Sequence, residues 1–375
     1  MGRLGGGRID PLIPATRWPL IDAVKGVACV LIVWHHMAIY GPMGEGAHAL
    51  APALFDWLAD YGRLAVQVFL VVGGFLAASS LAPHGAASTQ TAWHRIAGRY
   101  ARLVMPYLAA VGLTVLAAAM VRPWLGNALV PAAPTLLQLV AHALLLQDLL
   151  GYDALSAGIW YVAIDFQLFA LALLLLGAQR LAGALVLAMA VASLFFFNRS
   201  ADFDTTALYF FGAYGLGMMS WWSTRVERIG LWWLGIAALA SIGAAALWLD
   251  WRSRIAIALV TALCLALAER RSAVAPGRWA RIVGTPMLAL GRLGRISYSL
   301  FLIHFAVILL VAAAFTRWGV VPPWVDALGL LATFALSLAA ASLLHRWIEV
   351  RPASWRAVLA LFAALLACGA VSALR

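Results

Sequence analysis

Charged residues are scarce in this chain of 375 residues. They make up 11% of the sequence, whereas soluble globular proteins contain about 25%. Apolar residues reach 65%, and the mean hydropathy is +0.93. These values exclude a soluble enzyme, a disordered chain and a fibrous protein. They predict a polytopic membrane protein, and the long continuous apolar runs favour helices over a membrane β-barrel.

Cysteine and acidic residues are also few. Cys29, Cys264 and Cys368 each lie inside an apolar run, so we expect no disulfide and no metal site. The chain has 15 acidic residues against 26 lysines and arginines, a net charge of +11. In a soluble protein this excess would suggest nucleic acid. In a membrane protein basic residues collect in cytoplasmic loops, so we expect no nucleic-acid partner, with some arginines reserved for an anionic ligand.

Loop charges indicate which apolar runs cross the membrane. With the N-terminus inside, the arginine-rich loops are cytoplasmic and the acidic loops are outside, provided that the short run 135–150 does not cross. We therefore predict an all-α polytopic transmembrane helix bundle with a cytoplasmic tail at 1–17 and its C-terminus outside. The run 135–150 would lie in or dip into the outer leaflet. The eleven predicted spans are roughly 20–40, 64–82, 100–121, 157–178, 181–197, 206–222, 229–249, 254–268, 296–315, 324–344 and 356–374.

The first span carries Lys25 and His36, two ionisable residues inside an apolar run. They are eleven residues apart, so on a helix they share one face, about 16 Å apart along the axis. His35 points about 80° away from that face. Ionisable groups within a span usually mark function, and a histidine is a suitable general base for a hydroxyl. The alternative is that Lys25 extends to the surface and the histidines face the interface.

The third span opens with Arg95, Arg99 and Arg102, which form one cationic stripe at i, i+4 and i+7. Arginine forks suit phosphate groups. Anchoring at the cytoplasmic surface explains Arg95 well, but Arg102 lies deeper in the run. We therefore expect Arg99 and Arg102 to bind phosphate.

Two carboxylates lie in or beside apolar runs. Asp165, five residues after Trp160, is expected about eight residues in from the outer surface, where it needs a histidine or an arginine from another span. A purely structural ion pair is the alternative. Glu349 lies at a helix end before a proline and is interpreted as structural.

The run 296–315 contains Tyr298 and His304, with Arg292 and Arg295 just before it on the cytoplasmic side. His304 is expected in the middle of the membrane. There it either takes part in the chemistry or makes an interhelical hydrogen bond, and the second role is favoured.

These motifs, in this order, resemble the acyltransferase family 3 membrane proteins. The resemblance covers roughly residues 15–355. The sequence departs from the common family pattern at Gly73, where serine is frequent, at Met105, where proline is frequent, and at Asp165, where glutamate is frequent. The matching pieces are 21–26 leading to 35–36, 68–76, 99–102 with 106–107, 160–169, 296–304 and 349–352.

The resemblance implies a ten-helix acyltransferase core, here at 18–352, so the eleventh span given by the loop charges would be an additional C-terminal helix at 353–375. It implies an O-acyltransferase of the bacterial inner membrane that moves an acyl group, commonly acetyl, from cytoplasmic acyl-CoA to a hydroxyl of an extracytoplasmic polysaccharide or glycolipid. Acyl-CoA is then a donor substrate, and no bound cofactor is expected. The partners are acyl-CoA, the glycan or glycolipid acceptor and membrane lipid.

The essential pair of the family maps to Lys25 and His36, and its arginine pair maps to Arg99 and Arg102. His36, Lys25 and Asp165 are the expected catalytic residues, and His36 either acts as base on the acceptor hydroxyl or carries the acyl group transiently. Residues expected to bind acyl-CoA or substrate are Arg99, Arg102, His304, Trp160 and Tyr298. Aromatic residues near the outer side are typical of an interfacial belt, although some are suited to stacking on sugars: Trp34, Tyr40, Trp57, Tyr61 and Trp160.

Two other functions are consistent with buried charge in a helical bundle. A transporter exporting a glycan or a small acid would also need it, but the sequence has no repeated halves with broken helices. An acyltransferase of another family, acting on lipids or proteins, would share the chemistry without these motifs.

Overall fold

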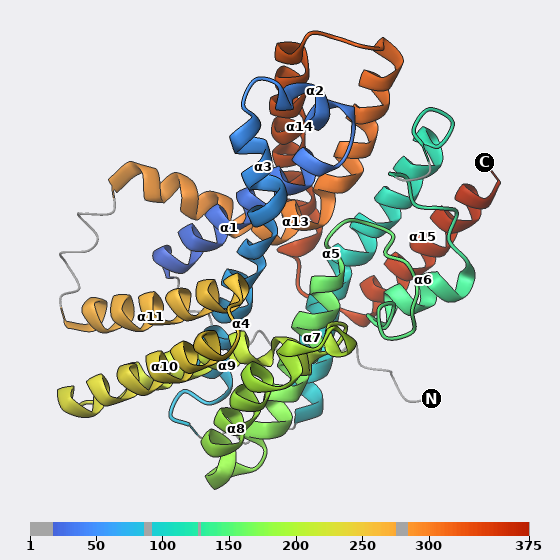
Figure 1. The fold of residues 1–375 in the computed structure, drawn as a ribbon. Helices are drawn as coiled ribbons and strands as arrows, with labels where there is room; N and C mark the ends of the chain where they lie inside the picture. The colour runs from blue at the N-terminus through green and yellow to red at the C-terminus, as the bar shows by residue number, and fades with distance from the viewer. Residues whose placement is uncertain (1–17, 86–91, 127–128, 275–283, 375) are drawn as a thin grey trace, which may run out of the picture.

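The computed structural model describes residues 18–85, 92–126, 129–274 and 284–374, and the tail expected at 1–17 lies outside them. Within these ranges the chain is helical and has no strand (Figure 1), which confirms the all-α prediction. The helices are α1 (Pro19–Ile39), α2 (Pro42–His48), α3 (Pro52–Tyr61), α4 (Val66–Leu81), α5 (Ala92–Val121), α6 (Leu136–Ala143), α7 (Trp160–Leu176), α8 (Ala182–Phe195), α9 (Ala207–Thr224), α10 (Ile229–Leu249), α11 (Ser253–Val274), α13 (Gly284–Trp318), α14 (Pro323–Leu344) and α15 (Trp355–Ala373).

Every predicted apolar run coincides with a helix. Eight helical segments in the described ranges are long and apolar enough to cross a membrane. In one of them α3 and α4 are joined by η1 (Gly62–Ala65), so that a continuous helical stretch runs over Pro52–Leu81. The apolar α7, with 17 residues, is shorter. These helices indicate a multi-pass membrane protein and confirm the polytopic bundle.

The helices α1 and α13 are packed backbone against backbone. A Cβ on Gly294 would lie 1.7 Å from the carbonyl oxygen of Asp22, and one on Gly26 would lie 2.5 Å from that of Leu290. Only glycine permits this approach, which is how small residues bring membrane helices together. The contact fixes the register of the two helices that carry His36 and His304.

The remaining helices flank this pair on two sides. Figure 1 shows α5, α6 and α15 side by side near the C-terminus, and α10 beside α11 on the opposite side of the molecule. The helices α4 and α9 pack against each other, and α7 contacts α4, α5, α8 and α9. The position of α7 brings its polar residues against α5.

The segment expected in the outer leaflet does not cross the membrane. Its helix α6 has eight residues and is about 12 Å long, far less than the hydrocarbon core. The buried ring of His142 joins α6 to the segment that follows it. Its Nδ1 donates to the carbonyl of Gln138, and its Nε2 accepts from the N–H of Leu155. Tyr100 of α5 donates to the carbonyl of Ala143 at 2.6 Å.

The segment between α6 and α7 brings the start of α7 close to the two helices α1 and α13. Gly158, just before α7, contacts both His36 and Phe301. Phe301 and His304 lie in the middle of the 35-residue α13. The helix within the expected span at 157–178 therefore begins beside these two side chains, in the interior of the bundle.

Candidate active site

Two histidines from α1 and α13 form a buried pair. Nδ1 of His36 and Nε2 of His304 are 2.8 Å apart. The two ring planes are within 8° of each other, with centroids 4.9 Å apart. The rings are therefore nearly parallel, and their facing nitrogens are at hydrogen-bond distance. His304 makes the interhelical hydrogen bond expected for it, and the partner is His36 itself.

A backbone carbonyl sets the tautomer of both rings. Nδ1 of His304 lies 3.2 Å from the carbonyl oxygen of Leu300, which can only accept, so this nitrogen carries the proton. In the neutral ring Nε2 of His304 is then an acceptor, and Nδ1 of His36 donates to it. The proton of His36 is thus held on Nδ1. Its Nε2 is left with a free lone pair, the state that a general base needs.

His36 lines a small cavity of about 190 Å³. Gly158 borders the cavity at φ +78°, and a Cβ there would lie 3.2 Å from Cε1 of His36 and 3.1 Å from Phe301. This position therefore suits glycine both by conformation and by space. Arg63 and Trp160 also line the cavity. The basic nitrogen of the pair thus belongs to a residue that borders a space able to admit a small substrate group.

His35 is part of the same cavity wall but is tied to another helix. Its Nδ1 bonds to the carbonyl of Leu58 in α3 at 2.8 Å. This is the interhelical hydrogen bond expected for a side chain that points away from the face of Lys25. His35 therefore positions α3 against α1.

Asp165 has found its partner in Arg99. Nη2 of Arg99 donates to Oδ2 of Asp165 at 2.5 Å, and the carboxylate side chain is only 8% exposed. The guanidinium also lies 5.4 Å from the ring centroid of Phe169. Of the two partners expected for Asp165, arginine is the one present. The ion pair joins α5 to α7.

The arginine stripe of α5 differs from expectation in its burial. Arg95, expected to anchor at the surface, is only 7% exposed, whereas Arg102, expected to lie deeper, is exposed. The spacing predicts that the three arginines share one face of α5, but it does not predict which of them the other helices bury. In the structure Arg95 is the buried one. The Nε atoms of Arg95 and Arg99 are buried and have no hydrogen-bond partner in the described part of the chain.

Tyr298 and Ser299, in the half of α13 before His304, make further polar contacts. Tyr298 donates to the carbonyl of Leu103 in α5 at 2.8 Å, beside the kink-prone Pro106. Ser299 donates to Glu349 at 2.5 Å. Glu349 also lies 3.1 Å from Nδ1 of His345, within a π-helical turn at His345–Glu349 that follows α14. Glu349 thus joins two helices, which agrees with its structural interpretation.

Three basic residues lie outside the cavity. Lys25 pairs with Asp22 at 3.8 Å and is about 16 Å from His36 along α1, so the structure does not bring the two together. Arg292 and Arg295 were expected just before a helix. Both lie within α13, which begins earlier than expected, and both are exposed.

Aromatic rings separate the histidine pair from the Arg99–Asp165 pair. The ring centroids of Tyr161 and Phe301 are 5.6 Å apart, and those of Phe301 and His304 are 6.3 Å apart. Tyr161 is one helical turn before Asp165 on α7. A group passing from the arginines to His36 would have to pass these rings.

A family model described as an acyltransferase domain, Acyl_transf_3, matches residues 18–342. The chain belongs to the acyltransferase 3 family. No curated protein and no solved structure gives a significant match. Membership in the acyltransferase 3 family makes this a membrane acyltransferase, and the match includes both histidines of the pair and both residues of the ion pair.

Sequence reasoning missed two features of this acyltransferase 3 site. Arg63 follows a stretch that contains Glu45, Asp56 and Asp60, and nothing in its sequence neighbours marks it as a cavity residue. Gly158 had a weak signal, because a glycine just before a helix that carries a buried carboxylate can mark a close approach. The tautomers of His36 and His304 could not be predicted from the sequence, because they depend on the position of the Leu300 carbonyl relative to the His304 ring.

Proposed function

We propose that this protein is an O-acyltransferase that takes an acyl group, most simply acetyl, from cytoplasmic acyl-CoA. The acceptor is a hydroxyl of an extracytoplasmic polysaccharide or glycolipid. The observation that carries this proposal is the free lone pair on Nε2 of His36, created by its hydrogen bond to His304 beside a cavity in the middle of the bundle. Membership in an acyltransferase family supports the same reaction class.

The reaction follows from the geometry of His36. The acceptor hydroxyl gives its proton to Nε2 while its oxygen attacks the thioester carbonyl carbon, and the C–S bond then breaks. The proton passes from Nε2 to the departing thiolate, so the products are an ester and CoA in its thiol form. His304 stabilises the charged His36 ring by accepting its Nδ1 proton in a hydrogen bond. No step needs a bound cofactor.

The arginines of α5 suit the phosphates of the donor. Arg102 is exposed, and the buried Nε atoms of Arg95 and Arg99 lack partners within the described residues. An anionic ligand would satisfy these donors. Asp165 holds Arg99 in place, and Tyr298 of α13 donates to the carbonyl of Leu103, the residue after Arg102 on α5. The acyl arm would then pass Tyr161 and Phe301 toward His36.

The membrane orientation belongs to the proposal as well. The inner membrane is the location that the resemblance implies. Loop charges favour a cytoplasmic N-terminus, which puts the Lys25 end of α1 inside and the His36 end toward the outside. A reporter fused after residue 375 should be extracytoplasmic, and one inserted near residue 275 cytoplasmic. A cytoplasmic C-terminus would contradict this orientation.

Transfer can be measured with the purified protein in vesicles, using radiolabelled acetyl-CoA and a polysaccharide acceptor. We expect labelled, alkali-labile ester on the acceptor, formed without any ion gradient and lost in His36→Ala. The Val260→Trp variant serves as control, because this exposed α11 residue lies away from the site. Gradient-dependent movement of glycan without ester formation would instead support the transporter alternative.

A further inference from the structure

Arg63 is a cation of the active-site cavity that has no acidic partner. It lines the cavity beside His36, and no aspartate or glutamate lines this space. In the described part of the chain Arg63 forms no ion pair. An unpaired charge within a membrane bundle is costly and usually marks function. The roles of His36 and His304 leave this cation unused, so its anionic partner has to be identified.

A close contact between η1 and α1 places Arg63 beside the histidines. A Cβ on Gly62 would lie 2.7 Å from Cβ of His35, so glycine is what allows η1 to come this near to α1. Nδ1 of His35 also bonds to the carbonyl of Leu58, one turn before η1. Gly62 and His35 are thus in contact, and the residues that follow them, Arg63 and His36, both line the cavity.

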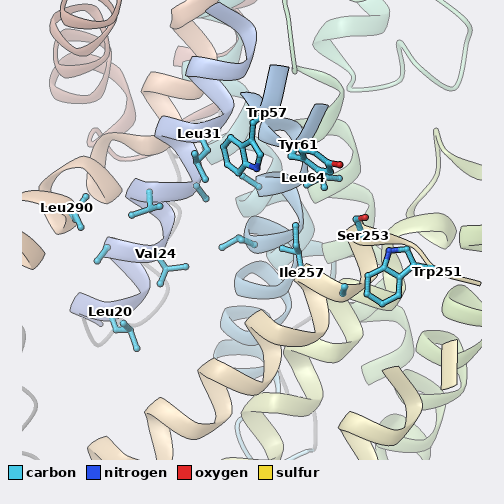
Figure 2. A pocket seen from close by; sticks show the side chains of 16 residues that line it. Leu20, Val24, Leu31, Trp57, Tyr61, Leu64, Trp251, Ser253, Ile257 and Leu290 are labelled. Carbon is cyan, nitrogen blue, oxygen red and sulfur yellow. The ribbon is translucent and has the colours of Figure 1, made fainter. Parts of the chain in front are cut away.

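The turn η1 has two different sides. Leu64 lines an open apolar groove together with Leu31 of α1 and Ile257 of α11 (Figure 2). Arg63 does not line this groove. It lines the cavity, as does Val66, three residues later in α4. The turn therefore presents its leucine to the groove and its arginine to the space that His36 borders.

The transfer reaction itself would form an anion in this cavity. When the acceptor hydroxyl attacks the thioester, the π electrons of the C=O bond move onto the carbonyl oxygen while Nε2 of His36 takes the hydroxyl proton. Only one carbon atom separates this oxyanion from the attacking oxygen, so both lie in the space that Arg63 and His36 share. The phosphates of the donor would stay at the arginines of α5, beyond the rings of Tyr161 and Phe301.

We propose that the guanidinium of Arg63 donates hydrogen bonds to this oxyanion and stabilises the tetrahedral intermediate. The inference rests on the proposed function and adds a catalytic residue to it. The hydroxyl oxygen forms the new C–O bond, and the π pair becomes the oxyanion. When that pair re-forms C=O, the C–S bond breaks and the thiolate takes the proton from Nε2 of His36. A donor already fixed in place costs no reorganisation as the charge develops, which is why such donors accelerate acyl transfer.

Arg63→Met removes the charge and keeps a long side chain. In ester formation from labelled acetyl-CoA by the full chain in vesicles, we expect kcat to fall by about 10²- to 10³-fold, the usual effect of losing one such donor. KM for the donor and the acceptor should stay near normal. Arg63→Lys should restore part of the rate, because it keeps the charge but not the planar fork. Arg180→Met is the matched control, since this exposed arginine of η2 (Gln179–Leu181) does not line the cavity, and it should change neither constant.

A bound carbonyl group reports the electrostatic effect of Arg63 directly. The probe is the methyl ketone analogue of acetyl-CoA in which CH₂ replaces the thioester sulfur, labelled with ¹³C at the carbonyl carbon. Because a guanidinium polarises the C=O bond, we expect the ¹³C resonance to move downfield on binding to the wild type and to His36→Ala, and to move much less in Arg63→Met. The affinity for the analogue, measured by calorimetry, should be the same in all three proteins, which shows that they are folded.

The possible failures are distinguishable. A wild-type kcat in Arg63→Met would overturn the inference. So would a raised KM for the acceptor with unchanged kcat, because Arg63 would then bind an anionic group of the acceptor, and so would a lowered kcat with an unchanged ¹³C shift. If Arg63→Met does not bind the analogue, Arg63→Lys decides: an oxyanion donor requires a lower kcat and a smaller downfield shift there, and wild-type values of both would contradict it. Absence of ester formation by the wild type, with polysaccharide or glycolipid as acceptor, would instead overturn the proposed function itself.

Discussion

Replacing His304 with alanine isolates the contribution of the histidine pair. The change removes the acceptor that holds the proton of His36 on Nδ1, while His36 keeps its place in α1. The hydrogen bond between two neutral rings contributes about 0.5–1.5 kcal/mol to the favoured tautomer. Because 1.36 kcal/mol corresponds to a tenfold change in rate, the expected loss in kcat is about 2- to 13-fold.

This loss should be much smaller than that of His36→Ala, since removing a general base costs about 10²- to 10⁴-fold. His304→Gln offers a matched control, because its amide oxygen can accept from Nδ1 of His36 and should restore most of the rate. KM for acetyl-CoA and for the acceptor should stay near normal in both His304 variants. A shift in the pH profile of kcat/KM in His304→Ala would report the altered basicity of His36.

The assay is ester formation under saturating donor, with the melting temperature measured in parallel to exclude unfolding. Two results would refute the reasoning. If His304→Ala is as inactive as His36→Ala and glutamine does not rescue it, His304 acts directly on a reacting group. If His304→Ala has full activity, the tautomer of His36 is not set by this contact.

Three further predictions follow from the same contacts. His35→Ala should leave the transfer rate near normal but lower stability by about 1–3 kcal/mol, because an α3 carbonyl loses its donor; an inactive His35→Ala beside an active His36→Ala would contradict the assignment. Arg99→Ala should destabilise the protein by about 3 kcal/mol, the low end for a broken buried pair because Arg99 is 31% exposed. Adding Asp165→Asn should restore the melting temperature but not the affinity for acyl-CoA measured by calorimetry, and restored affinity would remove Arg99 from the phosphate site. Gly294→Leu should lower both the melting temperature and kcat, since it forces α1 from α13, and unchanged activity would show that this contact does not set the histidine pair.

Much of the fold could be predicted because bilayer thickness restricts how an apolar run can fold. Loop charge separated the run 135–150 from the predicted spans, and the structure gives it a helix of only eight residues, too short to cross a hydrocarbon core. Helix ends were predicted less well. Because α13 continues before its apolar run, Arg292 and Arg295 are helical residues.

The site was predicted residue by residue but not as contacts. Periodicity indicated that His36 and His35 point in different directions, and each has a separate partner. The rule that a buried carboxylate needs a partner predicted that Asp165 is paired, but choosing Arg99 requires the packing of α7 against α5. The burial of Arg95 could not be predicted, because spacing on one helix does not say which neighbour covers it.

The glycine contact between α1 and α13 acts as a pivot. His36 follows Gly26 by ten residues, and His304 follows Gly294 by ten residues, so both histidines sit about 15 Å beyond the contact on lever arms of equal length. A change of about 10° in the crossing angle would move the two rings apart by about 2.6 Å, nearly the full length of their 2.8 Å hydrogen bond. The basicity of the active site is thereby coupled to the angle between two helices. Whatever wedges α1 from α13 on the histidine side of the pivot would lower the share of His36 in the reactive tautomer without touching either histidine.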